Sequence, residues 1–152
     1  MRKLFRVIVA GSRTATSEAT YTLLAARLDH LLSARKESHE IVIVSGTARG
    51  ADKLGERYAA ERHYKLLRYP ADWDTHGKKA GYLRNVQMSQ NAEALVALWD
   101  GKSRGTQHMI KIAEERNLPT RVIQFETYEV SSKGDRRFSA FFARLQDGRT
   151  IE

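Results

Sequence analysis

The sequence IVIVSGTARGAD, residues 41–52, decides the fold that we expect for this chain. Its first four residues are β-branched and apolar, a run typical of a strand that is buried on both faces. Ser45 and Gly46 then signal a turn, and Ala51–Arg62 has the pattern of a helix. A strand that turns into a helix through small residues directs the first N–H groups of that helix at one spot, where phosphate groups bind.

Two interpretations of this turn stay open. Either Gly46 and Gly50 are needed only for the conformation of a tight turn, or they let a phosphate-bearing ligand approach the backbone. Asp52 lies in the first helical turn, where its default role is to stabilise the helix dipole. If the turn is a ligand site, the predicted contacts are Ser45, Gly46, Thr47, Gly50, Ala51 and Asp52.

The same alternation of strand and helix runs through the rest of the chain. We predict further strands at Leu4–Ala10, Leu66–Tyr69, Ala94–Trp99 and Thr120–Phe125, and further helices from Glu18 to about Arg35, from about Lys79 to Gln90, and at Gln107–Arg116. This pattern indicates a doubly wound, Rossmann-like parallel sheet of about five strands with helices on both faces. The turns after the first, second and fourth strands are then expected to meet at the carboxyl edge of the sheet, where such folds bind ligands.

The pattern changes near residue 126, so we divide the chain into a nucleotide-binding domain, residues 1–126, and a C-terminal segment, residues 127–152. Ser132–Arg137 is polar and is expected to be a linker, and Asp147-Gly148 is a hairpin signal. We therefore expect a β-hairpin-like appendage that is cut off soon after its second strand begins. Either it packs back on the sheet or the sequence ends within a longer protein.

Composition restricts the class of protein. With 41% hydrophobic and 29% charged residues among 152, the chain has the composition of a globular domain with a real core. The absence of cysteine excludes disulfides and thiolate catalysis, and the five histidines lack ligand spacing, so no metal site is expected. No signal peptide or membrane-spanning run is evident, and we expect a cytoplasmic protein without a membrane partner.

The charge of the chain indicates its kind of partner. A net charge of +8 favours anionic partners such as nucleotides, nucleic acid or acidic lipid surfaces. The basic residues are scattered along the sequence, however, and form no stripe interleaved with aromatic residues, so most are expected to belong to a solvated surface.

Two further strand ends carry residues suited to phosphate. After the first strand, Gly11, Ser12 and Arg13 offer a flexible backbone, a hydroxyl and a guanidinium, or form an ordinary turn. After the fourth strand, a small-residue turn opens a helix, and its predicted contacts are Asp100, Gly101, Ser103, Gly105 and Thr106. Asp100 is a candidate for binding a ribose hydroxyl. Neither GxGxxG nor GxxxxGK[ST] occurs, which disfavours classical dinucleotide and NTPase sites.

One predicted helix adds a second group of candidates. Gly81, Arg84, Asn85 and Met88 share a helical face, and Trp73 precedes them, either to stack on a base or to fill the core. The carboxylates near the turns (Asp52, Asp72, Asp74 and Asp100) show no spacing that indicates a catalytic triad or a carboxylate pair. We therefore assign no catalytic residue.

Together these stretches resemble the SLOG superfamily, most closely its YspA-like branch. The resemblance spans about residues 4–125 and rests on VIVAGSR (7–13), VSGTARGAD (44–52), YPADW (69–73), AGYLRNVQM (80–88) and ALWDGKSRGT (97–106). It implies a Rossmann-like sheet with a pocket for a nucleotide-derived ligand. Relatives in the superfamily are the Lonely Guy phosphoribohydrolases, which release a base from a nucleoside monophosphate, and the DNA-processing protein A family.

The sequence departs from the phosphoribohydrolase pattern at the catalytic position. Those enzymes carry PGGxGTxxE with a catalytic glutamate, whereas this chain has GKSRGTQHM, with Met109 at that place. Their arginine–lysine pair resembles Arg84-Asn85, which keeps only the arginine. The chain therefore lacks the carboxylate that would stabilise an oxocarbenium-like centre, unless Asp52, Asp74 or Asp100 replaces it.

Three functions follow from these observations. The first is a module that binds a nucleotide or nucleotide-derived small molecule as sensor, carrier or sequestering protein and requires no cofactor. The second is a hydrolase acting on N-glycosidic or phosphoester bonds of such ligands. The third is single-stranded nucleic-acid binding, which predicts a steep dependence of affinity on salt. Because the relatives are often dimers or larger, a homo-oligomer is kept among the expected partners.

Overall fold

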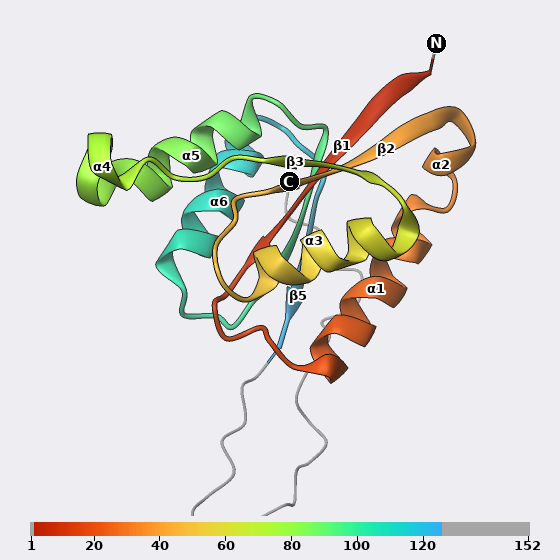
Figure 1. Ribbon diagram of the computed structural model, residues 1–152, viewed down its shortest axis with the longest axis horizontal. Coiled ribbons are helices and arrows are strands. Elements are labelled where there is room, and N and C mark those ends of the chain that lie inside the picture. The colour runs from red at the N-terminus through yellow and green to blue at the C-terminus, as the bar shows by residue number, and fades with distance from the viewer. Residues whose placement is uncertain (1, 126–152) are drawn as a thin grey trace, which may run out of the picture.

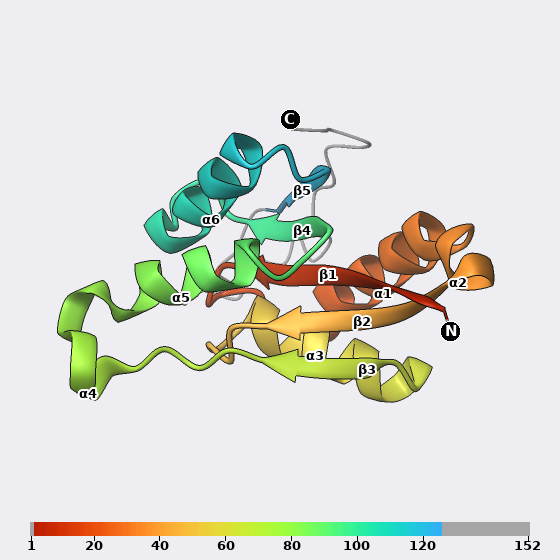
Figure 2. The ribbon, with the colours of Figure 1, turned by 90° about the horizontal axis from the view of Figure 1, so that it is seen from above.

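The computed structural model describes residues 2–125 and contains one five-stranded sheet (Figures 1 and 2). All neighbouring strands are parallel, and their order is β3-β2-β1-β4-β5. The doubly wound α/β prediction is confirmed, whereas the predicted C-terminal appendage lies outside the described residues. The strands are β1 (Lys3–Gly11), β2 (His39–Ser45), β3 (Lys65–Arg68), β4 (Ala94–Trp99) and β5 (Thr120–Gln124).

Helices cover both faces of the sheet, as Figure 2 shows. Alternate residues of β1 enter different cores: Val7 and Val9 pack with the helices α1 and α3, and Ile8 and Ala10 pack with α5 and α6. Within residues 2–125, no helix is long and apolar enough to span a membrane. The helices are α1 (Glu18–Leu32), α2 (Arg35–Ser38), α3 (Ala51–Arg62), α4 (Trp73–His76), the 3-10 turn η1 (Gly77–Lys79), α5 (Ala80–Ser89) and α6 (Arg104–Glu115).

Several element boundaries differ from the prediction by a few residues, and some of these differences have local reasons. Helix α6 begins three residues early because the Ser103 side chain accepts a hydrogen bond from the N–H of Thr106 and caps it. Strand β3 ends at Arg68, opposite the last residue of β2, instead of at Tyr69. The short helix α4 was missed, although Asp72 caps it by accepting a hydrogen bond from the N–H of Thr75.

Candidate functional site

The turns after β1, β2 and β4 meet at the carboxyl edge, as predicted, where the strand order reverses between β1 and β4. The Ser12 N–H donates to the Leu98 carbonyl (2.8 Å), and the Ala51 N–H donates to the Ser12 carbonyl (3.1 Å). Gly50 has φ +78°, and a Cβ on it would lie 2.3 Å from the Ser12 carbonyl oxygen. A Cβ on Gly11 would lie 2.1 Å from the Leu98 oxygen. These two glycines are therefore required for the turns to pack together.

Two adjoining cavities open at this edge. An inner cavity of about 380 Å³ lies against the α6 start and β1, and an outer cavity of about 720 Å³ lies against the β2–α3 turn and α4. Together we call them the cleft. Thirteen of the predicted ligand-binding residues line it: Gly11, Arg13, Gly46, Thr47, Asp52, Trp73, Arg84, Asn85, Met88, Asp100, Ser103, Gly105 and Thr106.

The remaining predicted residues lie elsewhere. The Ser12 hydroxyl is fully buried and accepts a hydrogen bond from the N–H of Asp100 (3.0 Å). The Ser45 hydroxyl donates to Glu56 (2.7 Å) and accepts from the N–H of Thr47 (3.0 Å), so both hydroxyls hold the turns in place. The residues that line neither cavity are Ser12, Ser45, Gly50, Ala51 and Gly101.

Helix α6 presents to the cleft N–H groups that are unbonded within the described part of the chain. In α3, which the sequence favoured, the first N–H is bonded to the Ser12 carbonyl. In α6, the Ser103 cap holds the N–H of Thr106, and the N–H groups of Arg104 and Gly105 make no hydrogen bond within residues 2–125. Because both residues line the inner cavity, the positive end of the α6 dipole faces it.

Arg84 and Asn85 join the two sides of the cleft. The Arg84 guanidinium donates from Nε to Asn85 Oδ1 (3.0 Å) and from Nη1 to the Gly46 carbonyl, which ties α5 to the β2–α3 turn. Burial lowers the pKa of Arg84, and nearby Arg13 acts in the same direction, while Asp52 opposes it. Arg13 itself makes no hydrogen bond or ion pair with the described part of the chain. The cleft thus holds two guanidiniums close enough to repel each other.

The Asn85 amide is fixed from α6. Its Nδ2 donates to the Gly105 carbonyl (3.3 Å) and to His108 Nδ1 (3.2 Å). Burial lowers the pKa of His108, so the neutral ring accepts this bond. Asn85 is therefore a positioned side chain and has little freedom to turn toward a base.

The two acids of the inner cavity differ in their surroundings. Asp100 Oδ1 accepts hydrogen bonds from the N–H groups of Lys102 (2.8 Å) and Ser103 (2.9 Å). Burial alone would raise the pKa of Asp100, but these bonds lower it below its usual value. Asp52 is only 5% exposed, and burial raises its pKa to about 6 against the opposing effects of the Ala48 N–H and Arg84. Asp52 is therefore the acid that titrates near neutrality.

The mouth of the outer cavity is aromatic. Trp73 is 54% exposed, which excludes the core-filling interpretation. A Cβ on Gly81 would lie 3.5 Å from Trp73 Cη2, so the indole ring lies over the start of α5. Tyr82 lines the same cavity and is also half exposed. These rings offer stacking surfaces at the edge of a charged cleft.

Among the lining residues that escaped the sequence prediction are three cationic residues and one tyrosine, and the quoted stretches contain three of these four. Arg49, Tyr82 and Arg104 lie inside these motifs, and Lys78 was assigned to the solvated surface. With Arg13 and Arg84, they give the cleft five cationic side chains against two acids. The sequence shows the residue types but not which side of each turn faces the cavity.

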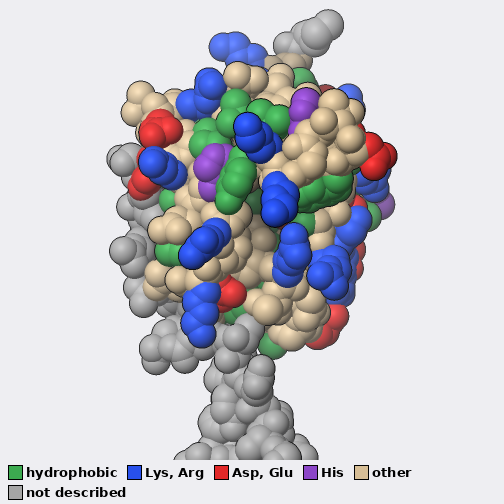
Figure 3. Space-filling view, turned by 90° about the vertical axis from the view of Figure 1, so that its left-hand side faces the viewer, with side chains coloured by type: hydrophobic (Ala, Val, Ile, Leu, Met, Phe, Trp, Pro, Cys, Tyr) green, Lys and Arg blue, Asp and Glu red, His purple; other side chains and the backbone are tan. Residues whose placement is uncertain are grey.

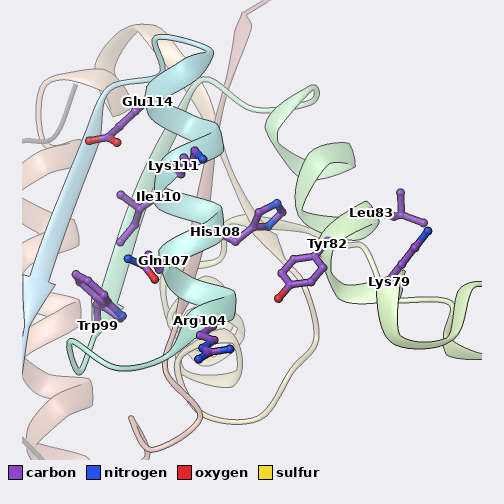
Figure 4. Close-up of a pocket in the computed structure, with 10 residues that line it drawn as sticks. All are labelled: Lys79, Tyr82, Leu83, Trp99, Arg104, Gln107, His108, Ile110, Lys111 and Glu114. Carbon is purple, nitrogen blue, oxygen red and sulfur yellow. The ribbon is translucent and has the colours of Figure 1, made fainter.

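A shallow groove of about 1010 Å³ continues from the cleft over α5 and α6 (Figure 4). Tyr82 and Arg104 line both, and the Tyr82 ring packs edge-on against His108 with centroids 4.5 Å apart. Lysine and arginine side chains on this side of the molecule surround hydrophobic and histidine side chains (Figure 3). Although the sequence shows no stripe of interleaved basic and aromatic residues, both kinds of side chain line the cleft and the groove on this face. The groove's other residues are Lys79, Leu83, Trp99, Gln107, Ile110, Lys111 and Glu114.

This strand order, with a cationic cleft at the switch point, defines a Rossmann-like α/β domain. The chain belongs to the YspA, cpYpsA-related SLOG family, whose family model matches residues 5–76. Gene 61 protein of Mycobacterium phage D29 is 35% identical over an alignment of 126 residues that covers 79% of this chain and 95% of that protein. The predicted resemblance is confirmed.

Two solved structures share the fold at low sequence identity. DNA processing protein A from Helicobacter pylori superposes with a TM-score of 0.55 and 18% identity, over 84% of this chain and 67% of that chain. The structural-genomics protein TM1055 superposes with a TM-score of 0.54 and 16% sequence identity, over 79% of this chain and 72% of that chain. At this identity the likeness concerns the fold alone.

Proposed function

We propose that the cleft binds a nucleotide or nucleotide-derived small molecule and that the protein acts as a sensor, carrier or sequestering module for it. The observation that carries this proposal is the meeting of Arg13, Arg84 and the unbonded N–H groups at the α6 start around one cavity. Cationic groups and helix N-termini are the usual partners of phosphate. Family membership supports a nucleotide-type ligand, for which no cofactor is required.

The arrangement of the cleft matches the parts of a nucleotide. The phosphate would lie in the inner cavity, and the base would lie in the outer cavity, against Trp73 or Tyr82. The ring of Trp73 is accessible for stacking because more than half of it is exposed. Asp100 is a weaker candidate for a ribose hydroxyl than the sequence indicated, since its Oδ1 is occupied by its own loop.

The test is a thermal-shift screen with mono-, di-, cyclic and ADP-ribose-type nucleotides, followed by calorimetric titration of the best one. A ligand at about 100 times its dissociation constant stabilises the folded state by roughly 2.7 kcal/mol. Arg13→Gln is the informative variant because Arg13 is exposed and has no partner within residues 2–125. We expect it to weaken binding at least tenfold.

Arg116→Gln is the matched control, since it removes the same charge from the exposed far end of α6. It is expected to bind like the wild type. If no nucleotide stabilises the wild-type protein, or if both variants lose binding equally, the proposal fails.

A second candidate function, single-stranded nucleic-acid binding, is favoured by one observation. Exposed Tyr82 lines both the cleft and the groove, exposed Trp73 lines the cleft, and cations line both hollows, among them Lys79 and Lys111 in the groove. Alternating rings and cations suit a strand of stacked bases and phosphates. DNA processing protein A, which shares the fold, was studied for its single-stranded DNA binding mode. This candidate predicts that an oligonucleotide binds more tightly than a mononucleotide, with a steep salt dependence that Lys111→Gln reduces.

The hydrolase alternative receives less support from the cleft. Met109, at the place of the phosphoribohydrolase glutamate, is 1% exposed, packs in the core and forms part of the apolar wall of the inner cavity. Asp52 and Asp100 are the carboxylates that line the described cleft. Chromatography of a nucleotide after prolonged incubation tests this alternative, because an intact ligand excludes turnover.

A further inference from the structure

Asp52 is a charged residue of the inner cavity that is almost fully buried and yet has few hydrogen bonds. Its Oδ2 accepts one hydrogen bond, from the N–H of Ala48 (3.0 Å), and its Oδ1 accepts none within residues 2–125. It forms no ion pair with the described residues, although it is almost fully buried. A carboxylate that is buried without an ion pair is costly, and its protonated form is favoured.

The charges around Asp52 come from four elements. Arg84 on α5 attracts its carboxylate, as does Lys53 on α3 itself, while Glu56 on α3 repels it. The same cavity is lined by Arg13 after β1, and by Asp100 and Arg104 at the start of α6. None of these described cations forms an ion pair with Asp52, so each acts on its carboxylate only through longer-range electrostatic attraction.

Gly46 lies between the carboxylate of Asp52 and the guanidinium of Arg84. A Cβ on Gly46 would lie 2.7 Å from Arg84 Nη1 and 2.9 Å from Asp52 Oδ2. Arg84 Nη1 donates to the Gly46 carbonyl instead of to Asp52. The guanidinium is thus close to the acid but is not committed to it, and its remaining donors are available to a ligand in the cavity.

We propose that Asp52 takes up one proton when an anion binds in the inner cavity, so that the cleft binds a phosphate group and a proton together. This inference rests on the proposed function. An anion on Arg13, Arg84 and the α6 N-terminus places a second negative charge beside a carboxylate that lacks an ion pair. The repulsion favours the neutral acid, whose O–H then donates a hydrogen bond to the ligand.

Two properties of Asp52 make this response available near neutrality. Burial raises its pKa to about 6 before any ligand is present, so a further rise past the pH of the solution neutralises it. Its Oδ1, to which no residue in the range 2–125 donates, borders the cavity and is free to carry the proton. Asp52 is therefore a specificity-determining residue, since it favours ligands with an oxygen that accepts a hydrogen bond at this point.

The experiment measures protons directly. Cyclic AMP and cyclic GMP are suitable probes because a phosphodiester has no second ionisation near neutrality, unlike a terminal phosphate with its pKa near 6. Calorimetric titration at about pH 7.5 in HEPES and in Tris, which differ in ionisation enthalpy, gives the number of protons bound per ligand. We expect uptake of up to one proton, and an affinity that falls by up to tenfold per pH unit between the pKa of Asp52 in the free protein and its higher pKa in the complex.

Two variants separate Asp52 from other titrating groups. Asp52→Asn keeps an acceptor for the Ala48 N–H, and it is expected to bind with no proton uptake and with an affinity independent of pH. Asp100→Asn, in the same cavity, is expected to keep the uptake. If the wild type binds without taking up a proton, or if Asp52→Asn still takes one up, the inference is wrong. If neither cyclic nucleotide nor any other nucleotide binds, the proposed function fails first.

Discussion

Helix α3 carries charged side chains into two regions of the molecule that treat charge in opposite ways. On the side facing α1, each charge has a partner: Arg62 binds Asp29 through two hydrogen bonds (3.0 and 2.8 Å), and the buried Tyr58 hydroxyl donates to the same carboxylate (2.7 Å). On the side facing the cleft, Asp52 has no ion pair within residues 2–125. Charges that are paired stabilise the fold, whereas charges left without partners are available to a ligand.

The arginines show the same contrast. Arg57, between α1 and α3, binds Glu18 with both Nη atoms and Glu61 with Nε, and it lies 3.8 Å from the centre of the Tyr21 ring. Arg13, in the cleft, binds nothing in the described part of the chain. If this difference marks function, equivalent substitutions in the two regions have opposite effects on stability and binding.

The largest expected effect on stability is a gain from Asp52→Asn. The pKa of Asp52 is raised from 3.8 to about 6 by folding, so the unfolded chain loses its proton first and folding becomes less favourable as the pH rises between these values. Above about pH 6 the cost is complete and amounts to at most roughly 3 kcal/mol. The variant is therefore expected to be more stable than the wild type at about pH 8 and equal to it near pH 4, as measured by chemical denaturation. Equal stability at both pH values would contradict this account.

The next effect is a loss from Asp29→Ala, in the paired region. It leaves the hydroxyl of Tyr58, a fully buried residue, without its acceptor and is expected to cost about 1–2 kcal/mol. Adding Tyr58→Phe removes the hydroxyl that Asp29→Ala leaves without an acceptor, and it is expected to recover part of the lost free energy of unfolding. This double-mutant cycle is read from denaturation midpoints, and strictly additive losses would show that the pair is not coupled.

The Arg6–Glu93 pair sharpens the comparison by its pH dependence. Glu93 accepts hydrogen bonds from the Arg6 side chain and N–H, and these lower its pKa. A lowered pKa in the folded state gives stability that is present above the unfolded value and is lost as the pH falls through the folded pKa. Glu93→Gln is thus expected to destabilise at neutral pH, by about 1 kcal/mol, and to have no effect near pH 2. This is the reverse of the pH response expected for Asp52→Asn.

The sequence was sufficient for the sheet because each strand is a short apolar run between turn residues, as in Ile41–Val44. It was also sufficient for the position of the cleft, because parallel strands place their following turns at one edge. It was not sufficient for the direction of individual side chains. Ser12 and Ser45 have hydroxyls suited to phosphate, yet backbone N–H groups of the turns take them. Small polar residues in tight turns bond most readily to the nearby backbone.

Charge at the site was equally difficult to predict. Asp52 appeared as a residue that stabilises a helix dipole, but burial raises its pKa, and the charge of Arg84, on a helix more than twenty residues further along the chain, opposes this rise. Lys78 reaches the cleft because Asp72 and η1 redirect the chain there, a local feature that hydrophobic periodicity does not reveal. Long-range packing, not residue type, decides which charges remain without a partner.

The smallest effect on stability is expected from Arg13→Gln. A small effect would show that Arg13, unlike the paired arginines, is not needed for the fold. Because Arg13 is exposed and without partners in the described chain, its loss is expected to change the free energy of unfolding by less than about 0.5 kcal/mol. Arg57→Gln, the same substitution in the paired region, removes three hydrogen bonds and is expected to lower the melting temperature more. Nucleotide titration of both variants is expected to invert this order, with binding impaired by the change at Arg13 and unaffected by the change at Arg57. If Arg13→Gln destabilises the fold as much as Arg57→Gln does, Arg13 has a structural partner, and the distinction between charges held for stability and charges left for a ligand does not apply to it.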